Sequence, residues 1–382
     1  MLSPFRLGKS QAVDDLKIKE VDMMTTMAPS TLGALAQAAI AKYLRQSIRY
    51  EKDVLADTDP ENLHQMRVGL RRLRTALQVF LPSIHIPPAA QSHQVGKIAR
   101  QLGKLRDLDV VIETLEADYL PDLPPPEQAL LNKVLKRLQK QRTKRFKQVK
   151  RLLKGKRYRR LKTSLHQWLE TPVWDVIAPL PAIQAVPDLV LPLVSQTWLH
   201  PGWLVGADIG VDTVDVAPPL APEATDAMIQ ACSETLHSLR KQIKRFRYQL
   251  KVVSNLYGDA LEADLDRLAE MQDNLGFLQD SWVMTEMITQ VVPKAQRKMP
   301  TLTALIVDRR HRAWETWQQL QRHYLNHRNR VALRQLLANP AGLNPQPGED
   351  NGNEAEAQQI EGDTGSYAQS FSKSADGAGS LA

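Results

Sequence analysis

Two segments of the chain carry a histidine followed by basic residues at helical spacing. The first runs from His64 to Arg74 and the second from His237 to Arg247. In a helix, positions three, four and seven apart share one face, so each segment gathers its cations into a stripe. The stripes consist of His64, Arg67, Arg71 and Arg74 in the first segment, and of His237, Arg240, Lys241, Lys244 and Arg247, with Tyr248 at the edge, in the second.

Neither stripe contains an acidic residue. Cations on neighbouring turns repel each other, and a solvated helix normally relieves that repulsion with acids four residues away. We therefore expect an external anion to neutralise the stripes. Arginine offers a planar fork suited to phosphate, lysine offers a point charge, and a bound anion would favour a protonated histidine. A solvated face is the alternative for either stripe alone, and the repetition argues against it. For the two histidines, capping or packing is an equally open role.

An apolar stripe runs beside each basic one, which predicts that one side of each helix is anchored in a helical bundle. The apolar stripes consist of Leu63, Met66, Leu70, Leu73 and Leu77 in the first segment, and of Leu236, Leu239, Ile243, Phe246 and Leu250 in the second.

The two basic segments align at an offset of 173 positions, and the same offset aligns Leu102–Asp107 with Leu275–Asp280. Two separate matches at one offset indicate an internal repeat. Each half is then one supersecondary unit, and we expect the two halves to pack with approximate two-fold symmetry.

Helical periodicity dominates the chain between about residues 30 and 338, which predicts an all-α fold. The expected helices lie at 31–56, 61–82, 90–118, 127–168, 224–257, 262–291 and 298–337. Nine of the 24 prolines lie in 171–222. The predicted organisation is a disordered leader at 1–29, a first helical half at 30–170, a proline-rich connecting segment at 171–222, a second helical half at 223–338 and a disordered acidic tail at 339–382.

The net charge of +8 is distributed unevenly. Seven acidic residues and one lysine follow Ala338, and the first 29 residues carry no net charge, so the body between them holds +14. Such an excess indicates a polyanionic partner, whether nucleic acid, a phosphate polymer or an anionic membrane surface. No apolar run is long enough for a membrane-spanning helix, so a soluble protein without membrane insertion is expected. The single cysteine, Cys232, excludes an intrachain disulfide and fits the cytoplasm.

A second basic element lies between Gln128 and Leu169, where sixteen lysines and arginines occur without an acidic residue. Cations there that face the repeated helices would complete a channel of positive potential, and we include Arg142 and Arg145 among them. For any single residue of this element the alternative is an exposed, solvated side chain. Lys104 and Arg106, which belong to the other repeated segment, complete the predicted binding set.

At these residues the sequence resembles the CHAD family, the conserved histidine α-helical domains. The resemblance spans about 31–337 and centres on the pattern His-x-x-Arg-x-x-x-Arg-Arg-x-Arg, with Leu105–Val110 downstream. It implies two helical bundles related by a pseudo-two-fold axis, around a basic central cavity that binds inorganic polyphosphate. It assigns binding roles to His64, Arg67, Arg71, Arg74, His237, Arg240, Lys244 and Arg247.

The sequence departs from the family pattern in two places. Gln279 stands where the first half has Arg106, and 171–222 lacks the regular helix that should open the second half. Family members often accompany a triphosphate-tunnel catalytic domain, whose Glu-x-Glu-x-Lys motif is absent here.

The predicted function is non-catalytic binding of inorganic polyphosphate. The predicted location is the cytoplasm, where the protein would associate with polyphosphate granules. No cofactor, metal or obligate protein partner is expected. Sequence-tolerant RNA or DNA binding is one alternative, and phosphotransfer through His64 or His237 is another. Phosphotransfer requires a group that orients the imidazole, and no P-loop or HExxH motif occurs; His323 and His327 lie four apart without a clear third ligand.

Overall fold

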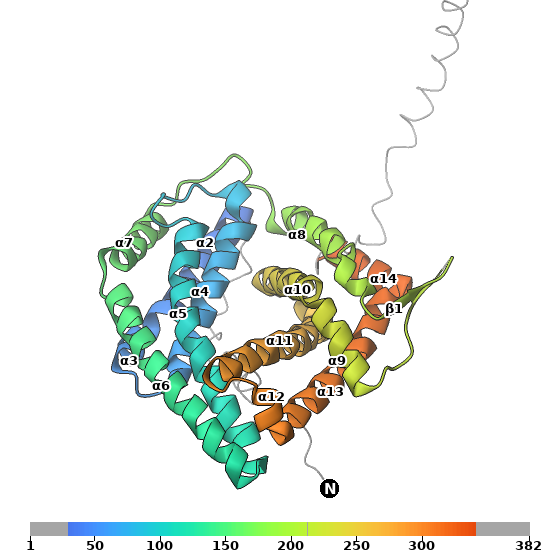
Figure 1. Cartoon of the computed structure of the whole chain (residues 1–382). Helices are drawn as coiled ribbons and strands as arrows, with labels where there is room; N and C mark the ends of the chain where they lie inside the picture. The colour runs from blue at the N-terminus through green and yellow to red at the C-terminus, as the bar shows by residue number, and fades with distance from the viewer. Residues whose placement is uncertain (1–29, 212, 341–382) are drawn as a thin grey trace, which may run out of the picture. The chain divides into compact units, whose positions relative to one another are not determined.

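The computed structural model describes residues 30–340 with the exception of residue 212. The leader predicted at 1–29 and the predicted tail from residue 341 onward lie outside the described residues. The all-α prediction is confirmed (Figure 1). The first half consists of α2 (Leu32–Arg49), α3 (Glu51–Ala56), α4 (Pro60–Val79), α5 (Ser92–Thr114), α6 (Pro125–Leu153) and α7 (Lys156–Glu170). The second consists of α8 (Ala182–Trp198), α9 (Pro222–Ala231), α10 (Ser233–Val253), α11 (Glu262–Val291), α12 (Ala295–Lys298), α13 (Pro300–Leu325) and α14 (His327–Ala338).

Four of the expected long helices are each divided in two. The helix expected at 224–257 is interrupted at Cys232, between α9 and α10. The helix expected at 31–56 is interrupted at Tyr50, between α2 and α3. The helix expected at 127–168 ends at Leu153, and Gly155 precedes α7 in an extended conformation. The helix expected at 298–337 is interrupted at Asn326, whose side chain accepts a hydrogen bond from the backbone N–H of Arg328 and so caps α14.

The order of the helices repeats between the halves. α4 packs on α2 and α5, and α10 packs in the same way on α8 and α11. α6 and α7 follow α5 as α13 and α14 follow α11. α4 also packs directly on α10. This contact joins the two halves and lies near the centre of the view in Figure 1. The repeat predicted from the offset of 173 therefore extends to the order and the neighbours of the helices, while the two-fold axis itself stays a prediction.

The segment 171–222 is more than a connection, which corrects the sequence-based interpretation. It contains α8, with Pro187 and Pro192 inside the helix. A proline inside a helix normally costs about 3 kcal/mol because it removes one hydrogen bond and crowds the preceding turn. α8 forms nevertheless because its apolar residues recur at helical spacing and are buried, among them Ala182, Val186, Val190, Leu193, Val194 and Trp198.

The remainder of the segment includes a small hairpin. β1 (Ala207–Ile209) and β2 (Val214–Val216) pair antiparallel, with Ala207 opposite Val216. The hairpin lies between α8 and α9, at a point where the first half passes directly from α2 to α3.

The core consists of two clusters of buried side chains. The larger one contains the predicted apolar stripes of both α4 and α10; Leu73, Ile243 and Phe246 have no exposed surface. The smaller one joins the C-terminal part of α5 and the N-terminal part of α6 to α11, α12 and α13. Both clusters combine side chains from the two halves, so the halves share their cores.

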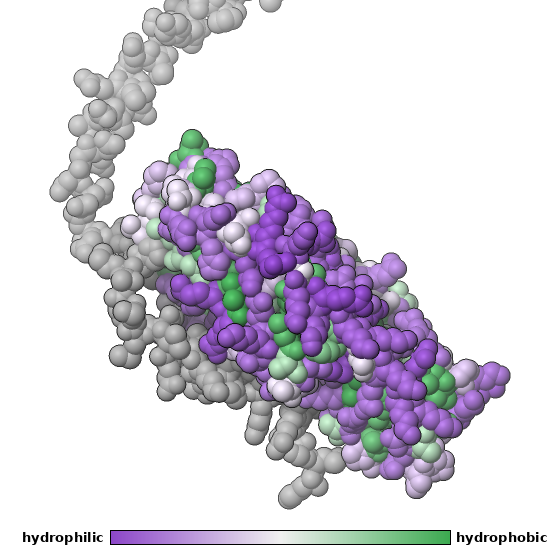
Figure 2. All heavy atoms as spheres, turned by 90° about the vertical axis from the view of Figure 1, so that its left-hand side faces the viewer, coloured by the Kyte–Doolittle hydropathy of each residue, from purple (hydrophilic) through white to green (hydrophobic). Residues whose placement is uncertain are grey.

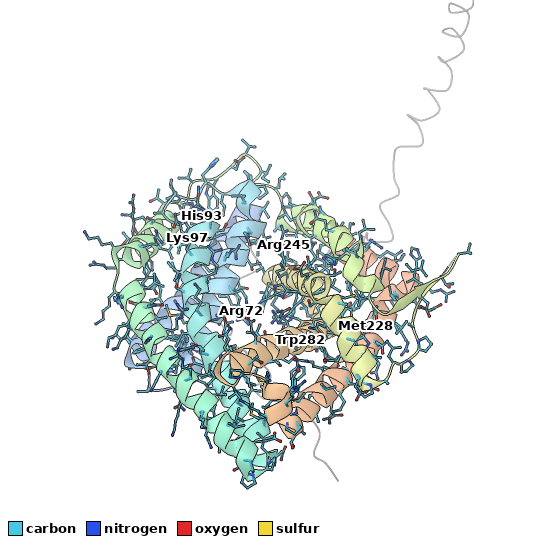
Figure 3. The ribbon with its side chains drawn as sticks, viewed as in Figure 1. Arg72, His93, Lys97, Met228, Arg245 and Trp282 are labelled. Carbon is cyan, nitrogen blue, oxygen red and sulfur yellow. The ribbon has the colours of Figure 1, made fainter. Side chains whose placement is uncertain are left out.

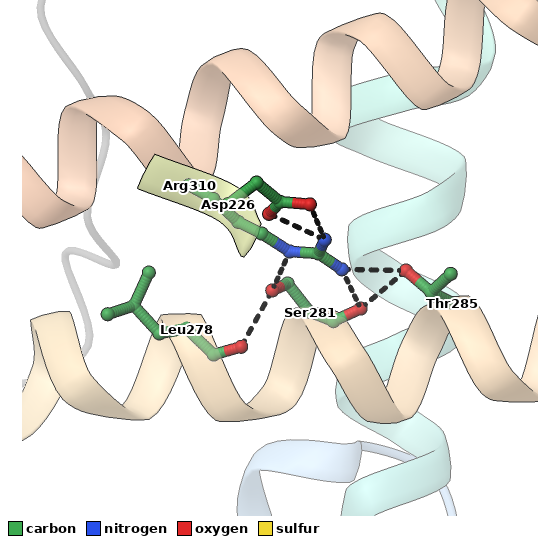
Figure 4. A network of polar contacts seen from close by, with 5 residues as sticks. All are labelled: Asp226, Leu278, Ser281, Thr285 and Arg310. Carbon is green, nitrogen blue, oxygen red and sulfur yellow. Dashed lines mark hydrogen bonds and ion pairs between the residues drawn. The ribbon is translucent and has the colours of Figure 1, made fainter. Parts of the chain in front are cut away.

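In each half one arginine from an outer helix ties two other helices together. Arg142 of α6 donates to Asp57, directly after α3, at 2.6 and 2.7 Å, and to Asp109 of α5 at 2.7 Å. Arg310 of α13 donates to Asp226 of α9 at 3.0 Å (Figure 4). Its guanidinium also donates to Ser281 and Thr285 of α11 and lies 3.6 Å from the ring centroid of Trp282.

Candidate functional site: the facing basic sides of α4 and α10

Local sequence fixes where α4 begins and which side it buries. The side chain of Asp59 accepts a hydrogen bond from the backbone N–H of Glu61 at 2.8 Å, and Pro60 occupies the first turn. His64 therefore lies in the second turn. Burial of the apolar stripe, including Met66 and Leu70, leaves the basic stripe along the opposite side of the helix.

The basic sides of α4 and α10 contact each other. The guanidinium of Arg71 lies 4.0 Å from the ring centroid of Tyr248 on α10, and that of Arg247 lies 5.5 Å from the same ring. Burial, followed by Arg71, Arg240 and Arg67, lowers the pKa of Lys244 from 10.5 to about 7. The structure thus brings side chains of both repeated segments into one cationic cluster.

Equivalent residues of the two halves lie close together in this cluster. Arg71 and Lys244 are 173 positions apart, and Arg71 is the charged neighbour that depresses the pKa of Lys244 most. Asp107 and Asp280 are also 173 positions apart, and Asp107 is among the groups that raise the pKa of Asp280. Equivalent residues that lie close to each other are expected near a two-fold axis.

The expectation that no carboxylate neutralises the stripes needs a correction. Arg67 pairs with Asp107 of α5, and Arg240 pairs with Asp280 of α11, in both cases at 3.7 Å between nitrogen and oxygen. The acids belong to neighbouring helices, so the spacing within the stripes could not reveal them. The two aspartate side chains are 66% and 61% exposed, respectively, so each pair lies at the solvent boundary of the cluster.

Two glycines in the second repeated segment make room for these arginines. A Cβ atom at Gly103 would lie 2.4 Å from Nη1 of Arg67, and one at Gly276 would lie 3.0 Å from Nε of Arg240. Gly103 and Gly276 are equivalent positions at the offset of 173. Their role was missed from sequence, although their repetition was a usable signal: glycine at the same place in both halves lets a guanidinium lie against helix backbone.

Several cations of the cluster form no ion pair among the described residues, although the charges of Arg247 and Arg71 act on the carboxylate of Asp273. The ion pairs found there include none of Arg71, Arg106, Lys244 and Arg247. Buried polar atoms without a hydrogen-bond partner also gather here: Nε of Arg71, Arg72, Arg106 and Arg240, Nη1 of Arg247, Nδ1 of His237 and the hydroxyl of Tyr248. A buried donor left unsatisfied costs about 1–3 kcal/mol, so an anion placed among these groups would gain that energy.

The two histidines occupy different environments. Burial, followed by Arg106, Arg71, Arg67 and Arg72, lowers the pKa of His64 to about 4, so the ring is neutral at pH 7 without an anion. Burial also lowers the pKa of His237, with smaller contributions from Lys241 and Arg240.

Arg72 is a member of the cluster that sequence analysis did not include. It lies among the charges that lower the pKa of His64 and of Arg71, and its Nη1 donates to Gln46 at 3.3 Å. Its equivalent, Arg245, comes from α10 on the other side of the α4–α10 contact (Figure 3). Two adjacent basic residues stand at equivalent positions in both halves, 71–72 and 244–245, and this repetition could have indicated Arg72 from sequence.

Other predicted residues lie apart from the cluster. Arg142 lies outside the cluster, because its guanidinium forms ion pairs with Asp57 and Asp109 instead. Arg145 donates to Gln148 on its own helix. Lys104 and Arg74 are exposed. The guanidinium of Arg74 lies over Gly96. The equivalent position in the second half is Ala269, so this glycine is not repeated.

A hollow of about 350 Å³ lies on the outer side of α6, and another of about 10 Å³ lies beside His237 and Trp282. Neither is lined by cations of both halves, so the central basic cavity stays a prediction. Within 30–340, residue 212 aside, no group of three or more potential metal ligands occurs. No helix of that same part has the length and apolar character needed to cross a bilayer.

The arrangement can be compared with known proteins. The sequence profile of the CHAD domain matches residues 38–289, about two thirds of the chain. The chain belongs to the CHAD domain family. The matched region begins in α2 and ends in α11, so it contains both basic stripes and both glycines, whereas α12, α13 and α14 lie beyond it.

The chain can also be compared with solved structures, of which PptA supports the fold assignment. PptA from Streptomyces chartreusis is 15% identical and aligns with a TM-score of 0.53 over 77% of this chain and 99% of its own. The crystal structure of the CHAD domain from the plant Ricinus communis is 24% identical, with a TM-score of 0.49 over 82% of this chain and 94% of that one. The sequence matches none of the curated proteins with which it was compared.

Proposed function

We propose that this CHAD protein binds inorganic polyphosphate, without catalysing a reaction, at the cluster formed by α4 and α10. The observation that carries the proposal is the convergence of cations from both halves whose buried N–H groups have no protein acceptor. Every phosphate of a polyphosphate chain carries negative charge and several acceptor oxygens. Such a ligand would neutralise the repulsion and satisfy the donors together.

The aromatic content of the cluster favours polyphosphate over a nucleic acid at this place. Single-stranded nucleic acids are usually held by aromatic rings that stack on bases. The aromatic ring at the cluster, that of Tyr248, is buried, and the guanidinium of Arg71 covers it. A ligand that consists of phosphates alone needs no such platform.

The environment of His64 favours binding over phosphotransfer. A phosphoryl-accepting histidine works with a group that orients its ring. The groups that shift the pKa of His64 most, after burial, are four arginines. These suit an anion that lies beside the histidine. We therefore assign the two histidines a role as hydrogen-bond partners of the bound chain.

The test is a titration of the full chain with polyphosphate at several salt concentrations. We expect affinity to fall steeply with salt, and Arg71→Ala to weaken binding about tenfold to a hundredfold, because a charge-assisted contact contributes about 1.5–3 kcal/mol. Lys298→Ala, which removes one exposed cation on α12, is the matched control and should bind like the parent. The proposal fails if Arg71→Ala binds as the parent does, or if RNA displaces polyphosphate at equal phosphate concentration.

A further inference from the structure

The outer side of α6 carries a row of cations that the α4–α10 cluster does not use. Nine exposed lysines and arginines follow one another along it: Lys133, Lys136, Arg137, Lys140, Lys144, Lys147, Lys150, Arg151 and Lys154. We call this set the α6 rail. The ion pairs found among the described residues include none of its members.

The rest of α6 holds the rail in place. Leu131, Val134, Leu138, Val149 and Leu153 are buried on the side opposite the rail. In the middle of the helix, Arg142 ties α6 to α5 and to the end of α3. At 1.5 Å per residue the rail extends for about 32 Å, so it is a straight row of cations on a fixed support.

The surface around the rail is hydrophilic. Figure 2 shows the side of the molecule on which α6 and α7 lie, and hydrophilic residues predominate there. Between Gln128 and Leu169 the sequence contains no acid. The hollow of about 350 Å³ opens among the rail side chains, with Arg137, Lys140, Lys144 and Lys147 in its lining.

We propose that the α6 rail binds the phosphate backbone of double-stranded nucleic acid, independently of sequence. A duplex presents one negative charge per 1.7 Å of axis, and one helical turn spans about 34–36 Å, close to the length of the rail. The duplex is stiff over about 150 base pairs, so its phosphates are already ordered when they meet a rigid row of cations. With one side of α6 buried in the core, the helix cannot enter a groove deeply enough to read bases.

The chemistry of the surface disfavours two other polyanionic partners. Single-stranded nucleic acid calls for exposed aromatic rings, but Tyr158 is buried and Phe146 packs against the core. An anionic membrane surface also attracts basic clusters, but firm interfacial binding adds apolar side chains that insert between lipids, and the exposed large hydrophobic residues of the described chain include none between residues 125 and 170.

The experiment measures binding of the full chain to a fluorescent 20-base-pair duplex by anisotropy. The rail variant is Lys140→Gln with Lys144→Gln and Lys147→Gln. The matched control removes the same number of exposed cations from α12 and the residue before it: Lys294→Gln, Arg297→Gln and Lys298→Gln. We expect the rail variant to bind the duplex roughly tenfold to a hundredfold more weakly, with a salt dependence flatter by about 2.7 in log–log slope, because three phosphate contacts are lost. The control should retain both.

Several outcomes would overturn the proposal. These are unchanged duplex binding by the rail variant, an equal loss in the control, or a loss of binding to phosphatidylserine vesicles while duplex binding stays intact. Polyphosphate binding is measured on the same variants. If the rail variant keeps it and Arg71→Ala loses it, the two sites are separate. Failure of the duplex proposal thus leaves the polyphosphate proposal standing, and the reverse also holds.

Discussion

The fold without a ligand disfavours the charged form of Lys244, so a substitution that removes this charge should stabilise the protein. Burial and three arginines lower the pKa of its ammonium from 10.5 to about 7. One pKa unit corresponds to about 1.4 kcal/mol, so keeping Lys244 charged in the fold opposes folding by about 5 kcal/mol as an upper bound. Lys244→Met retains the aliphatic stem and removes the charge.

The pH dependence follows from the direction of this shift. The unfolded chain keeps the Lys244 proton up to about pH 10.5, whereas the folded chain loses it near pH 7. Between these values the unfolded state binds more protons, so the stability of the parent rises with pH; below pH 7 the full penalty applies. We therefore expect Lys244→Met to be more stable than the parent at pH 6, by roughly 3 kcal/mol after relaxation, and the difference to shrink toward pH 10.

The measurement is urea unfolding at pH 6, 7.5 and 9 in a low-salt buffer without phosphate, alongside polyphosphate titration. The variant should bind polyphosphate about tenfold to a hundredfold more weakly. Lys241→Met removes an exposed cation from the same helix and should change stability little. Lys244→Arg cannot lose its charge and should lie below the parent in stability at pH 9. If Lys244→Met is no more stable than the parent at pH 6, the cationic cluster does not strain the fold and the reasoning is refuted.

Three further predictions concern the surroundings of the cluster. Gly103→Ala should leave stability unchanged or higher, since alanine favours helices, yet weaken polyphosphate binding about tenfold because Arg67 must move; equal binding in titrations would contradict this. Asp280→Asn removes a competing carboxylate and should tighten binding a few-fold, which a loss of affinity would refute. Arg310→Met leaves Asp226 without its ionic partner and should lower the unfolding free energy by about 3–5 kcal/mol in urea, without changing the binding of polyphosphate by the remaining folded protein.

Sequence periodicity predicted those parts of the structure that depend on one helix at a time. The apolar stripes of α4 and α10 are buried because residues three and four apart share a face. The offset of 173 also indicated that the halves are related, and the meeting of Arg71 with Tyr248 fits that relation. α8 was missed because its two internal prolines were given more weight than the recurrence of apolar residues from Ala182 to Trp198. In the structure, burial of those apolar residues stabilises the helix in spite of the prolines.

The parts that sequence could not supply depend on contacts between helices. Asp107 follows Arg67 by forty positions, so no spacing rule pairs them; the pairing depends on how α5 packs on α4. Arg142 belongs to a strongly basic segment, and the sequence predicts it as one more phosphate ligand. Its position on the inner side of α6 gives it two carboxylates instead, while its basic neighbours remain on the outside.

The two halves differ at the place where their charges meet, and the difference has a physical sense. If the second half repeated the first, an arginine would stand at 244, where Lys244 lies near Arg71 and Arg67 of α4, and another would stand at 279. Arginine stays charged at any accessible pH, so an arginine at 244 would be repelled by Arg71, Arg240 and Arg67 at every pH. Lys244 can release its proton near pH 7 and recover it when an anion arrives, and Gln279 keeps a polar side chain without charge. At this pair of equivalent positions the second half therefore provides a cation whose charge can respond to the ligand, Lys244, whereas the first half provides Arg71, which stays charged.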